Sequence, residues 1–278
     1  MPYIRIVDNK SQVIKDIAFT TLLNGMLPEP EKSVIHLFGE FDSAIYQRDS
    51  SVTKDALNNV HGDWYEWLLA ITAWNYCANN PNANLLLLTP NVSQFAIAKL
   101  YSERLYNLIQ DLREKVLISS SVQLISSNPD FVIIDRNLVN TIIPQISKIN
   151  TIDQLAIQKI DSAYRAFEHR CDFTDIIGYM SVKTSFRPDR RLQISHEGSL
   201  MKAIYTHLQT REWILNPKGI KYYAMATKVG EPDRRALKTV ATHSITSVQS
   251  IPQAAVDDVF EINTMQQAQI AFAQILNS

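Results

Sequence analysis

The chain has 278 residues, with 27 Lys and Arg against 28 Asp and Glu and a formal net charge of −1. This length suits one large domain or two small ones, and an apolar fraction of 46% is ordinary for a globular protein. The balanced charge argues against a protein that coats nucleic acid regardless of sequence, because such proteins carry a strong basic excess. It is compatible with basic residues gathered in one cleft.

The two cysteines, Cys77 and Cys171, lack the spacing of metal ligands, so we expect both to be reduced. No apolar run approaches the roughly 18 residues of a membrane span, and the N-terminus lacks the basic and then apolar layout of a signal peptide. These features predict a soluble, cytoplasmic protein.

We expect residues 1–60 to form a helical arm. A helix is expected over 11–24, ended by the two prolines of 27–30, followed by a short strand over 34–38 and polar loops at 40–43 and 47–51. The loops are either ordinary surface or part of an arm that reaches a nucleic acid.

A long helix is predicted next, with Asp63 as its N-cap. Its apolar stripe follows helical spacing and consists of Trp64, Trp67, Leu68, Ile71 and Trp74. Glu66 stands close to this stripe, where a carboxylate is costly to bury without a partner. Glu66 therefore either points to solvent or meets a cation.

The middle of the chain places a carboxylate between two predicted strands. Residues 122–126 and 131–135 are expected to form a strand pair around Asn128, Pro129 and Asp130. Such a junction often supplies a metal ligand, although most Pro-Asp pairs are simply turns. Around this unit we expect a short strand or helix start at 85–88 and helices over 92–115 and 152–169.

Lys183 lies near the end of a predicted strand over 180–185, because Pro188 lacks the N–H needed to continue a ladder. A lysine at a strand end can hold a phosphate as a point charge, or hold the water that attacks it.

A cluster of charged residues follows, made of Arg187, Asp189, Arg190 and Arg191. An arginine side chain can donate two hydrogen bonds to O6 and N7 of guanine, and a carboxylate can accept a hydrogen bond from N4 of cytosine. The cluster therefore has the groups needed to read G·C pairs. The alternative is a surface ion-pair cluster.

The next helix is expected to begin at His196, with Ser195 as a possible N-cap and Glu197 in the first turn. The helix dipole by itself favours an acid there, which is compatible with metal ligation. Together with Asp130 and Lys183, Glu197 could surround one Mg²⁺ and one scissile phosphate. Lys202 could touch a phosphate or be solvated.

Towards the C-terminus, a strand is predicted over 221–227. The sequence Pro-Asp-Arg-Arg of residues 188–191 occurs again at 232–235. Arg234 and Arg235 suit contact with an outer base pair or with the DNA backbone. One or two edge strands are expected over 236–250, and a helical tail over 252–276.

The order Pro-Asp, then Ser-x-Lys, then Arg-Pro-Asp-Arg, then a helix glutamate resembles the type II restriction endonucleases that recognise sites with a CCGG core. These form the AgeI- and NgoMIV-like group of the PD-(D/E)xK nuclease superfamily. The resemblance covers residues 128–204 and, more weakly, 60–74. The usual acid two residues before the lysine is replaced by Ser181, a substitution typical of this group, in which a glutamate on the following helix takes over its role. Glu197 matches that glutamate.

The resemblance implies an α/β fold with a restriction-endonuclease-like core, in which helices flank a mixed central sheet. We expect one domain over 1–278, with the arm at 1–60, the catalytic core at 61–240 and C-terminal strands and a helix at 241–278. Asp130, Glu197 and Glu66 would be the Mg²⁺ ligands, and Ser181 would orient Lys183 or a carboxylate. Asn58 or Asn59 would lie at the minor groove.

The implied activity is Mg²⁺-dependent double-strand cleavage in a prokaryotic cell, before the first cytosine of CCGG, at ACCGGT or RCCGGY. A palindromic site implies a homodimer, with dimer formation on DNA or a tetramer left open. Two alternatives remain. One is a DNA-binding protein or inactive nuclease that binds CCGG without cutting. The other is a repair or recombination nuclease, against which the arginine cluster argues.

Overall fold

The computed structural model describes residues 3–8, 10–124, 126, 128–246 and 251–277. Its centre is a five-stranded sheet in the order β3-β4-β5-β6-β7. These strands are β3 (Leu85–Leu88), β4 (Phe131–Ile134), β5 (Ile176–Lys183), β6 (Lys221–Ala226) and β7 (Asp258–Glu261). The β3-β4 and β4-β5 pairs are antiparallel, and the β5-β6 and β6-β7 pairs are parallel. The predicted mixed sheet is therefore confirmed.

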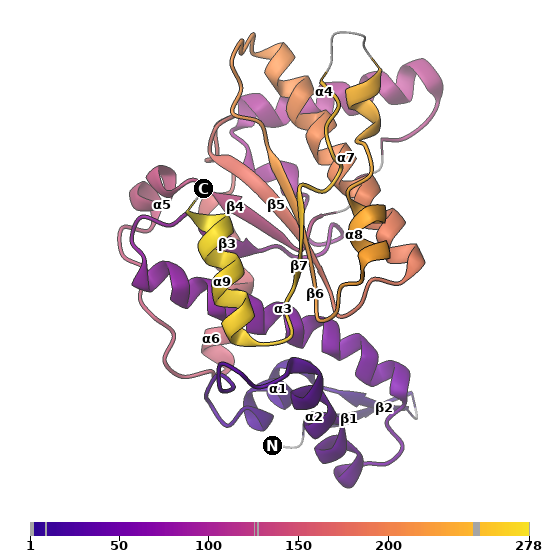
Figure 1. Cartoon of the computed structure of the whole chain (residues 1–278), viewed down its shortest axis with the longest axis vertical. Helices are drawn as coiled ribbons and strands as arrows, with labels where there is room; N and C mark the ends of the chain where they lie inside the picture. Colours follow the sequence, from indigo (N-terminus) through magenta and orange to yellow (C-terminus); the bar gives the residue numbers. More distant parts are fainter. Residues whose placement is uncertain (1–2, 9, 125, 127, 247–250, 278) are drawn as a thin grey trace.

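Helices cover both faces of this sheet (Figure 1). One layer consists of α3 (Lys54–Asn79), α6 (Gln154–Ser162) and α9 (Met265–Leu276), and the other of α4 (Glu103–Ser120), α7 (Pro188–Arg211) and α8 (Glu231–Leu237). At one end of the molecule, beyond α3, lie β1 (Ile4–Val7), β2 (Lys10–Val13), α1 (Lys15–Leu22) and α2 (Val34–Arg48). The short elements are α5 (Arg136–Ile142) and the 3₁₀ turns η1 (Ile97–Leu100), η2 (Ala163–Phe167) and η3 (Thr242–Ile245).

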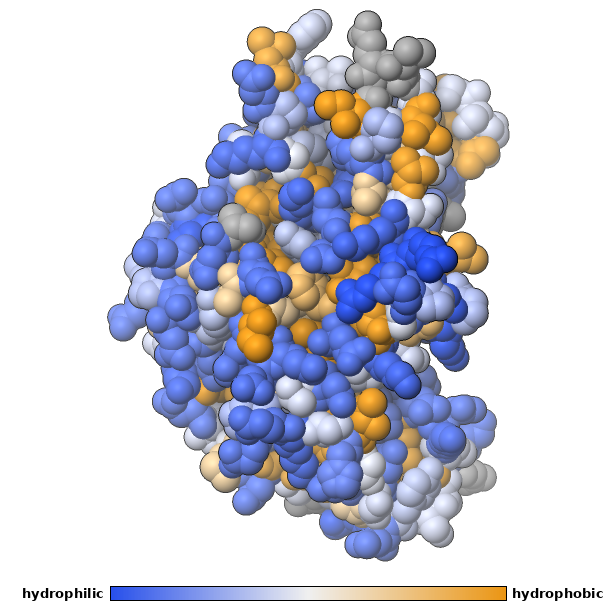
Figure 2. Space-filling view, viewed as in Figure 1, coloured by the Kyte–Doolittle hydropathy of each residue, from blue (hydrophilic) through white to orange (hydrophobic). Residues whose placement is uncertain are grey.

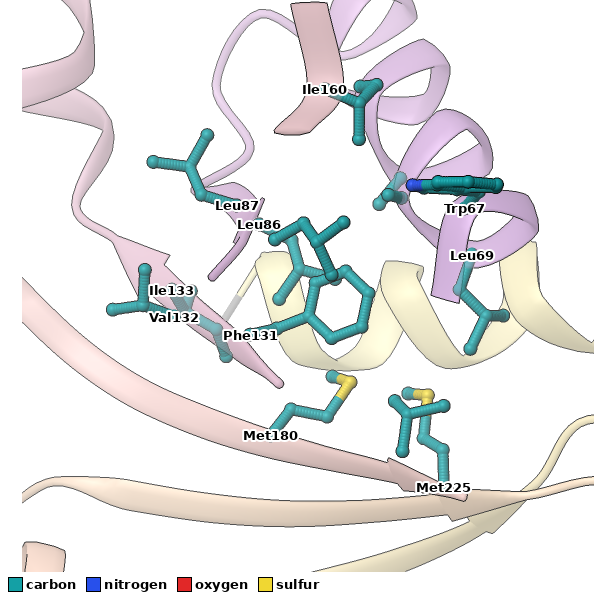
Figure 3. Close-up of a cluster of buried hydrophobic side chains, with 14 of the residues drawn as sticks. Trp67, Leu69, Leu86, Leu87, Phe131, Val132, Ile133, Ile160, Met180 and Met225 are labelled. Carbon is teal, nitrogen blue, oxygen red and sulfur yellow. The ribbon is translucent and has the colours of Figure 1, made fainter. Parts of the chain in front are cut away.

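The core fills the space between the sheet and the α3 layer. Figure 3 shows Phe131 and Met180 pointing from β4 and β5 towards Leu69 of α3. All four residues of β3 and of β4 are buried, as expected for strands covered on both faces. The site described below is thus carried by rigid, well-covered strands. Among the described residues, no helix is long and apolar enough to cross a membrane.

The N-terminal predictions need correction. Residues 34–38 form the start of helix α2 and not a strand, because Ser33 caps the helix by accepting from the His36 N–H. The buried residues of α2 recur at helical spacing, at Val34, Leu37, Phe38, Phe41 and Ile45. The residues expected as polar loops at 40–43 and 47–48 belong to the same helix, and the predicted helix over 11–24 begins as strand β2.

Asp63 is not a helix cap. Helix α3 begins ten residues earlier at Lys54, where the Thr53 hydroxyl accepts from the Ala56 N–H at 3.2 Å. Asp63 lies on the side of this helix and forms an ion pair of 2.6 Å with Lys15 of α1. Asn58, Asn59 and Glu66 consequently share one continuous helix.

Three further predictions differ from the structure. Strand β4 pairs with β3 and β5 and not with 122–126, where the described residues 122–124 and 126 form no strand and residue 125 lies outside the described part. The region expected to contain edge strands, 236–250, holds the end of α8 and η3, with 247–250 outside the described residues. The tail contains strand β7 before helix α9, and the helix predicted over 92–115 divides into η1 and α4.

Candidate active site and DNA interface

Asp130 and Lys183 meet because of the strand register. Phe131 pairs with Met180 in the antiparallel β4-β5 ladder, so the residue before β4 lies beside the end of β5. The Oδ2 atom of Asp130 accepts from the Val182 backbone N–H at 2.6 Å and from Lys183 Nζ at 2.7 Å. The two side chains are only 16% and 22% exposed. The predicted junction of an acid with a strand-end lysine is present.

Lys183 carries a stable positive charge in this setting. Burial disfavours the charge, but Asp130, Glu66 and Glu197 outweigh it, so the pKa of Lys183 lies above its ordinary value. A permanently protonated lysine suits holding a phosphate oxygen or a water and does not suit accepting a proton.

Glu66 reaches the same region from helix α3. Burial, followed by the nearby charge of Asp130, raises the pKa of Glu66 well above its ordinary value, while Lys183 acts in the opposite direction. Glu66 is half-buried, and its contact with a cation stays a prediction. Glu66 lines two cavities, of about 460 Å³ and about 480 Å³, and Asp130 lines the second of them.

Glu197 is held by two hydroxyl groups. Its Oε2 accepts from Ser181 Oγ at 2.6 Å and from the hydroxyl of Tyr222, and the two hydroxyl oxygens lie 2.8 Å apart. Ser181 thus orients a carboxylate, one of its two predicted roles. Glu197 is the tenth residue of α7, which begins at Pro188, so the expected start at His196 is wrong.

Ser195 does not cap α7, since it lies inside the helix, where its hydroxyl is 3.4 Å from the Ala236 carbonyl oxygen. The reason is the Arg187-Pro188 step: proline is favoured in the first turn of a helix, so the helix starts at the charged cluster. Glu197 is therefore placed by packing against β6 and not by the helix dipole.

Tyr222 was missed by sequence reasoning. It is fully buried on β6, and burial together with Glu197 raises the pKa of its hydroxyl well above the ordinary value, so the group remains a donor. A tyrosine within an otherwise apolar buried strand needs a partner for its hydroxyl, and that rule could have indicated a polar contact at residues 221–226.

The carboxylates fit a hard divalent cation that is completed by substrate. Among the residues that the structure describes, no three Asp, Glu, His or Cys side chains form a ready-made metal cluster. The charges of Asp130, Glu66 and Glu197 nevertheless all act on Lys183, so the three carboxylates lie in one region, and Lys15 also acts on Glu66. Mg²⁺ commonly binds one or two carboxylates together with substrate phosphate oxygens, and this donor set suits that arrangement.

Two of the predicted reading residues, Arg187 and Arg190, line one cavity with the predicted catalytic lysine, whereas Asp189 and Arg191 do not line it. The cavity of about 460 Å³ is lined by residues that include Asn58, Asn59, Glu66, Lys183, Arg187 and Arg190. Arg187 and Arg190 lie 3.4 Å and 3.8 Å from Asp189, with side chains 64% and 39% exposed. Ion pairs this exposed contribute about 0–1 kcal/mol, so a nucleic acid could displace them at little cost.

Of the remaining predicted contact residues, Arg191 and Arg234 are held by protein partners and Arg235 is exposed. Arg191 lies 3.4 Å from Asp233, which joins α7 to α8, and Arg234 donates to the Val259 carbonyl oxygen. Arg235 is exposed on α8, over which Figure 2 shows a strongly hydrophilic group of atoms. Lys202 is neither solvated nor free to touch a phosphate, since it is buried and ion-paired with Asp257 at 2.7 Å.

The sequence matches the Cfr10I/Bse634I restriction endonuclease family over residues 18–278. The type II restriction enzyme Cfr10I of Citrobacter freundii is 41% identical over 269 residues, which cover 95% of this chain and 90% of that protein. The chain belongs to the Cfr10I/Bse634I restriction endonuclease family. It is therefore a site-specific deoxyribonuclease that acts at a palindromic site, and the predicted enzyme class is confirmed.

Solved structures of this family agree with the fold. The crystal structure of the type IIF restriction endonuclease Bse634I with cognate DNA superposes with a TM-score of 0.87 at 29% identity, covering 98% of this chain and 96% of that chain. A second Bse634I structure gives 0.86 at the same identity and coverage. The restriction-endonuclease fold is thus confirmed, and DNA is the expected partner of this family member. The narrower resemblance to the AgeI- and NgoMIV-like CCGG group stays a prediction.

Proposed function

We propose that this enzyme makes Mg²⁺-dependent double-strand cuts at a palindromic site with a CCGG core. The observation that carries the proposal is the single cavity lined by Lys183 of the catalytic pair and by Arg187 and Arg190 of the reading cluster. Base recognition and phosphate chemistry would then take place in one groove. The proposed sites are ACCGGT or RCCGGY, cut before the first cytosine to leave 5′-CCGG overhangs.

In the proposed reaction, a water attacks the phosphorus in line with the bridging 3′ oxygen; the new P–O bond forms as the bond to the 3′ oxygen breaks, and the water gives up a proton to solvent while the 3′ oxygen takes one up from solvent. Lys183 holds the attacking water or a non-bridging oxygen through its ammonium group, and Asp130 fixes the position of that ammonium at 2.7 Å. Asp130, Glu197 and Glu66 would hold Mg²⁺, which supplies Lewis-acid stabilisation of the charge that develops on the phosphate. Ser181 keeps Glu197 oriented through its hydrogen bond of 2.6 Å.

Arg187, Asp189 and Arg190 would read the CCGG core in the major groove, with Asn58 and Asn59 on the minor-groove side. Arg191, Arg234 and Arg235 would contact the backbone or the outer base pair. Support comes from the chemistry of the cluster and from its exposure at the start of α7. Each good bidentate contact contributes roughly 1–3 kcal/mol of discrimination.

A palindromic site is matched by a two-fold protein, with one active site for each strand, so the proposed working unit is a homodimer. Its DNA substrate would place it in the cytoplasm of a prokaryotic cell. We propose that residues 1–278 act as one endonuclease domain.

The test is digestion of a plasmid of known sequence with Mg²⁺, followed by sequencing of the fragment ends. Discrete ends with 5′-CCGG overhangs are expected, and the flanking bases would separate ACCGGT from RCCGGY. Ends with a different core would refute the proposed specificity. Intact plasmid together with tight, selective binding to CCGG duplexes would favour the second candidate, a relative that binds without cutting.

A further inference from the structure

One oxygen of the Glu197 carboxylate accepts hydrogen bonds from side chains on two strands. Ser181 of β5 and Tyr222 of β6 both bond to Oε2, and their own oxygens are 2.8 Å apart. All three side chains are at most 3% exposed. Three mutually bonded groups from β5, β6 and α7 leave the carboxylate little rotational freedom, although a glutamate side chain is otherwise flexible.

Tyr222 is itself fixed to the helix that carries Glu197. Its backbone N–H donates to Asp257 Oδ2 at 2.7 Å, and the same oxygen lies 2.7 Å from Nζ of Lys202, which is on α7. Lys202 Nζ also donates to the Ala254 carbonyl oxygen at 2.6 Å. A shift of α7 relative to β6 would therefore break a buried ion pair, which is costly.

Close packing reinforces this attachment. A Cβ atom added to Gly198 would lie 2.3 Å from the Ala255 carbonyl oxygen and 3.1 Å from the Tyr222 ring. The absence of a side chain at Gly198 lets α7 approach β6 closely enough for Glu197 and Tyr222 to bond. The tyrosine is thus held at its backbone, its ring and its hydroxyl.

We propose that Tyr222 is a positioning residue, whose hydroxyl holds Glu197 in the orientation in which it binds the divalent cation. This inference rests on the proposed function, in which Glu197 is a metal ligand. It adds a residue outside the acid and lysine set and predicts an effect on metal binding that does not depend on DNA recognition. Groups that orient metal ligands typically change metal affinity or activity by roughly 10- to 100-fold when removed.

The experiment compares the full chain with its Tyr222→Phe variant, which keeps the ring and loses only the hydroxyl. Mn²⁺ binding is measured from the loss of the free-ion signal in electron paramagnetic resonance, and cleavage is followed as a function of Mg²⁺ concentration. We expect roughly 10- to 100-fold weaker Mn²⁺ binding and a matching shift of the Mg²⁺ dependence to higher concentration. Affinity for a duplex without divalent ions should be unchanged.

Tyr179→Phe is the matched control. Tyr179 is the register partner of Tyr222 on β5, it is equally buried, and its hydroxyl lies 3.4 Å from Tyr101 and not at the acids. Its variant should lose a buried hydroxyl without losing metal affinity. The thermal unfolding midpoints of the two variants show whether both substitutions destabilise the fold by the same amount. Mn²⁺ binding is compared at a temperature at which both variants are folded.

Ser181→Ala removes the other hydroxyl and should weaken Mn²⁺ binding in the same direction. Unchanged Mn²⁺ affinity in Tyr222→Phe, or an equal loss in Tyr179→Phe, overturns the inference. Two other results would refute the proposed function itself and are independent of Tyr222. One is normal cleavage by the Lys183→Ala variant, and the other is fragment ends without CCGG.

Discussion

Asp130 and Lys183, 53 positions apart in the chain, form an ion pair of 2.7 Å at the junction of β4 and β5. The same carboxylate oxygen accepts the Val182 N–H at 2.6 Å, so the acid is bonded to the backbone of the strand that carries the lysine. A two-point attachment of this kind fixes the ammonium group before any substrate arrives. Preorganised charge of this type is a large contribution to catalysis in enzymes generally.

Lys183→Ala should abolish cleavage and leave DNA binding intact. The variant loses the cation that holds the attacking water or phosphate, while Arg187 and Arg190 remain in place; loss of one electrostatic stabiliser of this kind typically costs roughly 10²- to 10³-fold in rate. Plasmid digestion gives the rate, and gel shift without Mg²⁺ gives the affinity. The control is Lys238→Ala, which breaks an exposed ion pair of 2.9 Å with Asp258. Normal cutting by Lys183→Ala would refute the catalytic assignment.

Arg190→Ala should weaken binding to the specific duplex more than to a random duplex. One lost base contact corresponds to roughly 1–3 kcal/mol, or about 5- to 150-fold in affinity at the specific site. Arg211→Ala is a matched control, because Arg211 lies at the other end of the same helix and its side chain is also 39% exposed. Titration of each duplex with each variant measures the affinities. Equal losses of affinity for the specific and the random duplex in Arg190→Ala would contradict a role in base recognition.

Glu66→Gln should stabilise the metal-free protein at neutral pH. Burial, with the charge of Asp130, raises the pKa of Glu66 above the ordinary 4.5, so the folded protein binds the proton more tightly than the unfolded chain does. Stability is therefore lost as pH rises from about 4.5 through this raised pKa, and the glutamine variant escapes that loss.

Thermal unfolding in a chelator from pH 5 to 8 measures this effect. Adding Mg²⁺ should then raise the midpoint of the wild-type protein more than that of Glu66→Gln, because the variant has lost a carboxylate that would face the ion. The exposed Glu114 of α4 supplies the control, Glu114→Gln. A wild-type midpoint that runs parallel to the Glu66→Gln midpoint across this pH range would argue against the electrostatic account.

Gly198→Ala should destabilise the fold and reduce cleavage. The added Cβ would meet the Ala255 backbone oxygen at 2.3 Å and the Tyr222 ring at 3.1 Å, so α7 must move away from the segment before β7 and from β6; strain of this kind typically costs about 1–3 kcal/mol. Gly39→Ala, in helix α2 with no atom within 4 Å of the added carbon, should instead stabilise by roughly 0.5–1 kcal/mol. Denaturant unfolding of the two variants should give changes of opposite sign, and a stable Gly198→Ala protein would contradict the packing argument.

The catalytic strand could be predicted because its signals are local. Alternation over residues 180–183 and the stop at Pro188 specify a strand end, and the structure places Lys183 there. The site residues Asp130, Ser181 and Glu197 were named through a family resemblance. Their contacts depend on sheet register for Asp130 and on the packing of α7 against the sheet for Glu197, which bring together residues 53 and 16 positions apart and are not encoded in any short segment.

Helix boundaries were the less predictable part. Residues 34–38 are rich in strand-forming side chains, yet Ser33 and the apolar spacing through Ile45 specify a helix that buries one face. Asp63 has the chemistry of a cap, but Thr53 begins the helix earlier and Asp63 pairs with Lys15. In both cases a capping residue further upstream marks the start of the helix, and the partner of Tyr222 lies on another element, α7.

Helix α7 carries Arg187 and Arg190 at its start and Glu197 about two turns after Arg190, roughly 10 Å further along at 1.5 Å per residue. The hydrogen bond between Glu197 and Tyr222 of β6 opposes any shift of this helix. With the proposed roles, a wrong base pair that pushes the start of α7 would strain this contact of a metal-binding acid. The enzyme would then discriminate against a wrong sequence twice, once when the DNA is bound and again when the strand is cut. Non-cognate sites would be cleaved even less often than they are occupied.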